Sequence, residues 1–313
     1  MAGLCDIYLA VPRGFCAGVK RAISLVEKAL EDYGAPVYVR HEIVHNRHVV
    51  ENLRQRGVVF IEDFDEIKDD SRPVILSAHG VPKAVETAAA RRKLTVIDAT
   101  CPLVAKVHRQ IRKLAEEGRE IVVIGKKEHP EIIGTVGQVD CQDRVHIINS
   151  VNEALTLNLP SGCKAGVVTQ TTLAVDDAEY ITACLRRKFN ELAEQKGSDI
   201  CYATTFRQKA VREIAAKADG VIVIGSQKAK NSSNSKHLQQ TALQNGAAKA
   251  WLIDDADELP WPELENLNSL GISAGASAPE YLVDEVIAEL KKHYKNLKIH
   301  DIIVAEENIE FKN

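Results

Sequence analysis

Three cysteines, Cys16, Cys101 and Cys201, occupy the same place in a threefold internal repeat. Each stands directly before a segment whose apolar residues follow the i, i+3, i+4, i+7 spacing of an amphipathic helix. The free N–H groups and the dipole at the start of such a helix stabilise a thiolate, which is the form of cysteine that binds a metal. Three thiolates suit an iron–sulfur cluster that lacks one protein ligand and keeps one iron open for a substrate. A zinc ion held by the three cysteines is the alternative.

The rest of each repeat supplies polar groups. A strand-like run follows each predicted helix: PVYVR, EIVVIG and GVIVIG. A polar loop is expected after each strand, and its central residue, His45, His129 or Ser232, follows the cysteine by 29, 28 or 31 residues. Three later apolar runs, VILSAHGVP, GVVTQTTL and LGISAGASAP, lead into further polar loops. Ligand sites in open α/β sheets form beyond the carboxyl ends of strands, so these loops are expected to ring one central cavity.

The residue types in these loops suit a phosphate-bearing ligand. Imidazoles, hydroxyls and amides can each donate a hydrogen bond to an oxyanion. The candidates are His45, His79, His129, Thr171, Thr172, Ser232, Ser233, Asn234 and Ser277. Glu131, the carboxylate that follows His129 in a repeat loop, is a candidate proton donor.

The repeat also predicts the fold class, an α/β protein of three pseudo-threefold-related α/β domains around a central iron–sulfur cluster. The expected domains are residues 17–101, residues 102–198, and residues 1–16 together with 199–313. The length of 313 residues agrees with three domains of ordinary size.

Composition excludes several other classes of protein. A net charge of −4 and the absence of a basic stripe give no footprint for nucleic acid. No apolar run is long enough for a membrane span, and Asp6 and Arg13 interrupt the N-terminal apolar stretch, so no secretory signal is expected. The sequence predicts a cytoplasmic protein. An odd count of seven cysteines in that compartment argues against a disulfide framework.

Nine ordered motifs resemble the family of 4-hydroxy-3-methylbut-2-enyl diphosphate reductases. They are RGFCAGVKRAI, YVRHEIVHN, SAHGV, DATCPLV, HPEIIGTVGQ, TQTTL, DICYATTFRQ, KNSSNS and SAGASAPE, from about residue 7 to residue 285, and EENIEF near the end also fits. The resemblance implies a three-domain α/β iron–sulfur enzyme of isoprenoid biosynthesis. Its reaction is the last step of the methylerythritol phosphate route, in which the allylic alcohol diphosphate is reduced to isopentenyl and dimethylallyl diphosphates plus water.

The resemblance also implies roles for individual residues. One [4Fe–4S] cluster per chain would be bound by Cys16, Cys101 and Cys201. The substrate diphosphate would be held by His45, His79, His129, Ser232, Ser233, Asn234 and Ser277. Glu131 would supply a proton, and Thr171 would orient the substrate hydroxyl. Reduced ferredoxin or flavodoxin would deliver the two electrons, and no nucleic acid or membrane partner is expected.

One departure from the family pattern is Glu128, which stands where many relatives carry a small residue before the HPE histidine. The chain also lacks the N-terminal extension of plant relatives, which favours a bacterial-type enzyme. Two rival functions from other classes remain at this stage. One is a three-cysteine zinc hydrolase, and the other is an iron–sulfur sensor without catalytic activity.

Overall fold

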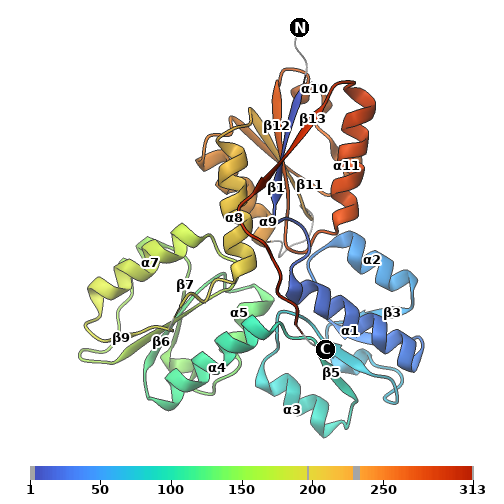
Figure 1. The fold of residues 1–313 in the computed structure, drawn as a ribbon. Helices are drawn as coiled ribbons and strands as arrows, with labels where there is room; N and C mark the ends of the chain where they lie inside the picture. The colour runs from blue at the N-terminus through green and yellow to red at the C-terminus, as the bar shows by residue number, and fades with distance from the viewer. Residues whose placement is uncertain (1–3, 196, 228–232, 312–313) are drawn as a thin grey trace. The chain divides into compact units, whose positions relative to one another are not determined.

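The computed structural model describes residues 4–195, 197–227 and 233–311. The chain forms two compact units, and each is described by itself. The first unit comprises Met1–Ala17, His45–Val49 and Tyr202–Glu310. The second comprises Gly18–Val44 and Val50–Cys201, with Phe311–Asn313. Figure 1 labels the elements of both units.

The described part of the first unit is built on a five-stranded parallel sheet in the order β11-β10-β12-β1-β13. Its strands are β1 (Asp6–Val11), β10 (Gly220–Ile224), β11 (Lys249–Ile253), β12 (Ser269–Ala274) and β13 (Lys298–Ile303). Its helices are α8 (Tyr202–Ala215), α9 (Ser233–Gln244), α10 (Trp261–Leu264) and α11 (Glu280–His293).

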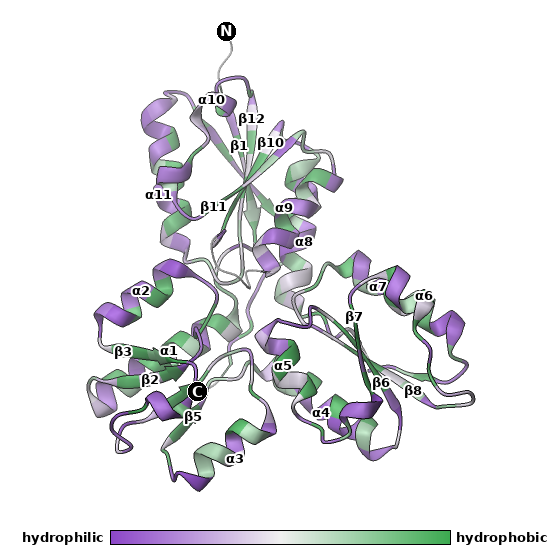
Figure 2. Ribbon diagram, turned by 180° about the vertical axis from the view of Figure 1, so that it is seen from behind, coloured by the Kyte–Doolittle hydropathy of each residue, from purple (hydrophilic) through white to green (hydrophobic). Residues whose placement is uncertain are grey.

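Both faces of the central strands in this sheet are buried, as expected for a parallel sheet. Side chains alternate along β10, so Ile222 and Ile224 pack with the apolar face of α11. Val221 and Val223 point the other way and pack with α8 and α9. In Figure 2 the helices accordingly show a hydrophobic side and a hydrophilic side. The near-continuous apolar run GVIVIG reflects this double burial.

The second unit contains two four-stranded parallel sheets in its described residues, in the orders β3-β2-β4-β5 and β7-β6-β8-β9. The first has β2 (Val37–Arg40), β3 (Val58–Ile61), β4 (Val74–Leu76) and β5 (Val96–Asp98), and the second has β6 (Glu120–Ile124), β7 (Val145–Ile148), β8 (Ala165–Thr169) and β9 (Leu192–Ala193). The helices are α1 (Ala17–Tyr33), α2 (Arg47–Gln55), α3 (Lys83–Arg91), α4 (Pro102–Glu116), α5 (Pro130–Val136), α6 (Val151–Thr156) and α7 (Val175–Lys188). The first turns of α1 and α2 begin within the first unit.

The α/β class with parallel sheets is confirmed. Each of the three residue ranges expected from the sequence contains the strands of one sheet. The compact units are two rather than three, however, so the division into three domains stays a prediction.

The three expected helices begin directly after Cys16, Cys101 and Cys201, as α1, α4 and α8. The polar segments that follow the first strands were expected to be loops, and this expectation is wrong in part. His129 is the N-cap residue of α5, and Glu131 already lies in the first turn of that helix. Ser233 and Asn234 likewise begin α9. Proline, serine and asparagine all favour helix starts, so these polar segments lead into helices rather than remain irregular.

None of the helices within the described residues is both long and apolar enough to cross a membrane.

Candidate active site

The three cysteines share a backbone interaction that reproduces the repeat. In each case the cysteine N–H donates to a backbone carbonyl in the turn after the later strand of a repeat. These strands are β12, β4 and β8. The pairs are Cys16 to Ala276 at 3.2 Å, Cys101 to Ala78 at 3.0 Å and Cys201 to Thr171 at 3.1 Å. The cysteine backbone is therefore fixed at the carboxyl end of a parallel strand, where ligand sites form.

All three cysteines are half-buried. A ligand cysteine must be accessible to a metal yet held in place, and half-burial with a bonded amide meets both requirements. The residue type of these side chains suits an iron–sulfur cluster, because such clusters are bound by thiolates. Cys16 belongs to the first unit, and Cys101 and Cys201 belong to the second. Among the residues that the structure describes, no group of three or more His, Cys, Asp or Glu side chains could hold a metal ion, so the three-cysteine set stays a prediction.

In the second unit, Glu131 and Thr171 form a buried pair. Their exposed fractions are 2 % and 4 %. The Thr171 backbone N–H donates to Glu131 Oε1 at 2.6 Å, and the Thr171 hydroxyl lies 3.0 Å from Glu131 Oε2. A hydroxyl can donate to an ionised carboxylate and accept from a protonated one. The pair can therefore keep its geometry when Glu131 gains or loses a proton.

Burial raises the pKa of Glu131 to about 7, because removal from water disfavours the ionised carboxylate. The two hydrogen bonds from Thr171 oppose this shift and lower the pKa. The negative charge of Asp199 raises it further. An acid of this kind is partly protonated near neutral pH. It can therefore donate a proton to a substrate and take up another proton afterwards, as a general acid must.

The Thr171 peptide links this acid to a cysteine. Its N–H donates to Glu131, and its carbonyl accepts the N–H of Cys201. A second bond joins the residues two positions before Thr171 and Cys201: the Thr169 N–H donates to Asp199 Oδ2 at 2.9 Å. The segments 169–171 and 199–201 are therefore tied together at two points, and a shift of one segment must move the other.

His129 and His79 lie close together in the same unit. Their ring centroids are 5.9 Å apart in an edge-to-face arrangement. His129 is buried, and its Nδ1 accepts the backbone N–H of Glu131 at 3.2 Å. A neutral imidazole that accepts at Nδ1 carries its proton on Nε2. The histidine is thereby set as a hydrogen-bond donor through Nε2.

Helix α5 is held against the segment that follows His79. The Gln138 amide donates to the Val81 carbonyl at 2.7 Å, and the Lys83 N–H donates to the Gly137 carbonyl at 2.9 Å. A Cβ on Gly134 would meet the Gly80 carbonyl oxygen at 2.9 Å. Glycine is thus required at this close approach of two backbones, which brings the segments of His129 and His79 together.

In the first unit, the turn at residues 275–277 gathers the other predicted residues. The Ala276 N–H donates to Asn234 Oδ1 at 3.0 Å, and its carbonyl accepts the N–H of Cys16. The Ser277 hydroxyl donates to the backbone carbonyl of His45 at 3.1 Å. One turn therefore connects four of the residues chosen from the sequence. All four come from segments that are distant in the chain.

Four further positions from the sequence analysis have different surroundings or lie outside the described residues. Ser233 is buried beside Asn234 at the start of α9, whereas Ser232 lies outside the described residues. The Thr172 hydroxyl accepts from the Gln170 amide at 3.1 Å and thus faces a different partner from Thr171. Glu128 is exposed and precedes the N-cap of α5.

Sequence reasoning missed Asp199 and Gln138. Asp199 stands two residues before Cys201, and a carboxylate so close to a predicted ligand was an available signal. Gln138 ends the HPEIIGTVGQ motif and gave no chemical signal, because its role is to fix α5 through a backbone carbonyl.

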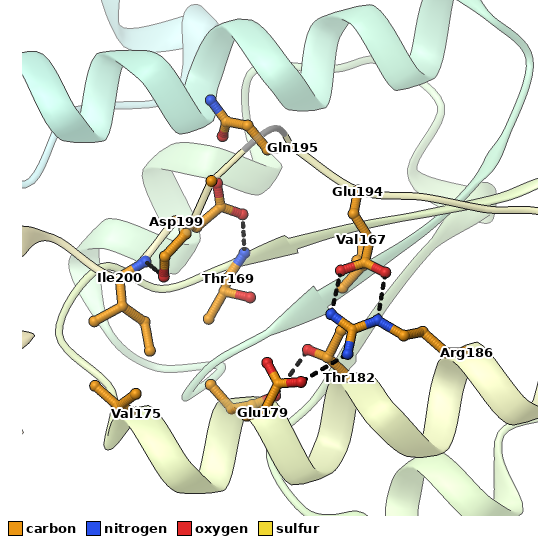
Figure 3. Close-up of a pocket in the computed structure, with 13 residues that line it drawn as sticks. Val167, Thr169, Val175, Glu179, Thr182, Arg186, Glu194, Gln195, Asp199 and Ile200 are labelled. Atoms are coloured by element: carbon orange, nitrogen blue, oxygen red, sulfur yellow. Dashed lines mark hydrogen bonds and ion pairs between the residues drawn. The ribbon is translucent and has the colours of Figure 1, made fainter.

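A cavity of about 340 Å³ opens beside β8 and α7 in the second unit. Figure 3 shows Asp199 at one side, with its bond to Thr169, and Arg186 held by Glu179 and Glu194 at the other. Asp199 lines this cavity, but none of the residues chosen from the sequence does.

Comparison with known proteins places the chain in a family. Residues 7–291 match the family model described as LytB protein. The chain is 49% identical over 306 residues to 4-hydroxy-3-methylbut-2-enyl diphosphate reductase of Ruegeria sp. (strain TM1040), which covers 98% of this chain and 95% of that protein. It is 52% identical over 310 residues to the reductase of the same name from Gluconobacter oxydans (strain 621H). This match covers 98% of this chain and 90% of that protein.

Two solved structures are also similar. The structure titled E-1-hydroxy-2-methyl-but-2-enyl-4-diphosphate reductase from Plasmodium falciparum is 38% identical, covers 99% of this chain and 95% of that one, and has a TM-score of 0.92. A structure titled (E)-4-hydroxy-3-methyl-but-2-enyl diphosphate reductase is 32% identical and has a TM-score of 0.64. The match covers 92% of this chain and 100% of that one. With a family match over most of its length and relatives near 50% identity, this chain belongs to the LytB protein family.

Proposed function

We propose that this chain reduces (E)-4-hydroxy-3-methylbut-2-enyl diphosphate to isopentenyl and dimethylallyl diphosphates. The reaction takes up two electrons and two protons, breaks the allylic C–O bond and releases the oxygen as water. It is the last step of the methylerythritol phosphate pathway. Membership of the LytB family and the names of the relatives support this activity over nearly the whole chain.

Family membership implies an iron–sulfur reductase. We assign Cys16, Cys101 and Cys201 as the ligands of one [4Fe–4S] cluster per chain. Three half-buried cysteines with the same backbone hydrogen bond support the assignment. When bound, such a cluster supplies the two electrons and, with only three protein ligands, one open coordination position.

The diphosphate is assigned to His45, His79, His129, Ser232, Ser233, Asn234 and Ser277. These side chains are neutral or tunable donors, which suit the many oxygens of a diphosphate. The Nε2 proton of His129, set by the bond at Nδ1, supports its role as a donor. Binding the diphosphate supplies binding energy at a distance from the bond that breaks.

Glu131 is assigned as the proton donor, and Thr171 as the residue that orients the substrate hydroxyl. The observation that carries the proposal is the buried Glu131–Thr171 pair, with a Glu131 pKa raised to about 7. A hydroxyl leaves a carbon far more readily as water than as hydroxide, so the acid must hold a proton when the C–O bond breaks. The Thr171 hydroxyl, already at the carboxyl group, can bond to the substrate hydroxyl at the same place.

The electron donor is proposed to be reduced ferredoxin or flavodoxin, and the cytoplasmic location expected from the sequence stays a prediction. Neither contributes to the assignment of the site residues.

The test is to purify the full chain without oxygen, measure iron, acid-labile sulfide and zinc, and then assay the allylic diphosphate with a reduced dye. About four irons and four sulfides per chain, with turnover, are expected. Cys101→Ser should lose iron and activity together, whereas Cys163→Ser, a cysteine outside the repeat, should keep both. Zinc without sulfide would indicate a hydrolase, and a cluster without turnover would indicate a sensor. Either result would overturn the proposal.

A further inference from the structure

We infer that the C-terminal segment 304–310 is a strap that positions Cys16, with Arg207 and Glu307 as the positioning residues. The inference deepens the proposed function and rests on the role of Cys16 as a cluster ligand. All the contacts that carry it lie within the first unit.

Arg207 lies in the second turn of α8, and its side chain is fully buried at 0 % exposed. Its guanidinium has four partners, one of which is the Arg13 carbonyl, 3.5 Å from Nη2. Nε and Nη2 donate to the Gly14 carbonyl at 3.0 and 2.7 Å, and Nη1 donates to the Ala203 carbonyl at 3.0 Å. Nη1 and Nη2 also donate to the two carboxylate oxygens of Glu307 at 2.6 and 2.9 Å. A guanidinium that is out of water needs such a bidentate partner, because an unpaired buried charge is strongly destabilising.

The carbonyl that Arg207 holds belongs to the turn that leads into Cys16. Gly14 has a φ of 63°, and a Cβ there would meet the carboxylate of Glu280 at 3.0 Å. Its N–H donates to the Ala274 carbonyl at 3.2 Å, while its carbonyl accepts from Arg207. Both backbone groups of Gly14 are therefore bonded, one to the end of β12 and the other to α8. Cys16 follows two residues later, so Arg207 restrains the backbone that presents its thiol.

The strap reaches Arg207 directly from the sheet. Strand β13 pairs in parallel with β1 up to Val11 and Ile303, and the Val304 N–H then donates to the Val11 carbonyl at 3.0 Å. From there the chain runs on for three residues to Glu307, which is 15 % exposed. Its neighbour Glu306 is exposed, and its carboxylate accepts from the Asn308 amide at 3.3 Å. The two adjacent glutamates thus differ in environment, and only Glu307 neutralises the buried guanidinium.

This arrangement makes the C-terminal segment part of the Cys16 site. Without the Glu307 carboxylate, Arg207 keeps its charge but loses its counter-charge, and the side chain is expected to turn toward solvent. The Gly14 carbonyl then loses its two donors, while the Gly14 N–H keeps its bond to the end of β12 and Arg13 keeps its ion pair with Glu280. The expected consequence is local opening around Cys16 rather than loss of the fold.

The experiment compares Glu307→Ala with Glu306→Ala in the full chain, purified without oxygen. In the holoenzyme, iron release to a chelator should be about tenfold faster in Glu307→Ala and unchanged in Glu306→Ala. After the iron has been removed, the rates of alkylation by iodoacetamide are measured separately for Cys16, Cys101 and Cys201. Cys16 should react about tenfold faster in Glu307→Ala, and Cys101 should not change.

The milder variant Glu307→Gln keeps an acceptor for the guanidinium and should fall between the wild-type protein and Glu307→Ala. It also keeps the test decisive if Glu307→Ala does not fold. An unchanged Cys16 rate in both Glu307 variants, or an equal rise at all three cysteines, would refute the strap. If Cys16 alkylation responds while iron release does not, the strap holds, and the assignment of Cys16 as a ligand fails.

Discussion

Replacing Thr171 by valine should move the pH dependence of catalysis to higher pH. The Thr171 hydroxyl bonds to Glu131 Oε2 at 3.0 Å in a buried place, and this bond lowers the pKa of Glu131. Valine has nearly the same shape but no hydroxyl. The carboxyl group therefore loses a donor that favours its ionised form, while the backbone bond from residue 171 to Oε1 remains.

The size of the shift follows from the two protonation states. A hydrogen bond to a charged group contributes about 1.5–3 kcal/mol, and one between neutral groups about 0.5–1.5 kcal/mol. The midpoints of these ranges differ by about 1.25 kcal/mol, and one pKa unit corresponds to about 1.36 kcal/mol. The pKa of Glu131 should therefore rise by about one unit from its starting point of about 7. If protonated Glu131 is the acid, kcat/KM is constant below this pKa and falls about tenfold per pH unit above it.

The assay is kcat/KM for the allylic diphosphate from about pH 6 to pH 9, without oxygen and with excess reduced dye. Thr171→Val is expected to have lower absolute activity, because the substrate hydroxyl loses a partner, but its alkaline limb should lie about one unit higher. Thr172→Val is the matched control, since that hydroxyl accepts from Gln170 rather than bonding to Glu131. A limb that stays in place or moves to lower pH in Thr171→Val would show that Glu131 is not the group that titrates.

Three other variants test the same site. Glu131→Gln should keep its iron but lose about 10²–10⁴-fold in kcat, since an amide cannot deliver the proton; near-normal turnover would remove Glu131 from the mechanism. Asp199→Asn removes a negative charge that raises the pKa of Glu131, so its alkaline limb should move to lower pH, opposite to Thr171→Val; a shift in the same direction would contradict the electrostatic account. Gly134→Ala should destabilise the protein by about 1–3 kcal/mol and lower activity with iron retained, because the new Cβ meets the backbone of Gly80 at 2.9 Å; unchanged thermal unfolding would refute that contact.

Much of the fold follows from hydrophobic periodicity in the sequence. The segments after Cys16, Cys101 and Cys201 alternate apolar and polar residues at helical spacing, and the runs EIVVIG and GVIVIG are apolar enough to be buried on both faces. Periodicity reports which residues are buried and does so locally, which explains why α1, α4 and α8 begin where the sequence indicates. It does not report which sheets belong to one compact unit, so the division into three domains stays a prediction.

The candidate site was predictable in its residue types but not in its connections. Glu131 and Thr171 could each be chosen as polar residues after a strand, yet nothing in the sequence says that the Thr171 peptide bonds to Glu131 on one side and to Cys201 on the other. Such bonds depend on the three-dimensional approach of segments 40 and 30 residues apart. The polar residues at His129 predict a loop, whereas His129 caps helix α5 by accepting the Glu131 N–H at Nδ1. That bond depends on side-chain geometry, which the residue pattern does not contain.

Arg207 shows why the rest of the site was beyond sequence reasoning. An arginine in the polar run ATTFRQ is normally interpreted as a solvated side chain on the outer face of a helix, since arginine is almost never fully buried without a partner. Its partner Glu307 lies 100 residues further on, in a segment to which the sequence assigned no chemistry. The burial of Arg207 therefore depends on its ion pair with Glu307, and the local sequence around either residue does not predict that pair. If the strap positions Cys16, the fit of the C-terminal EENIEF motif to the family has a physical cause in the second of its glutamates.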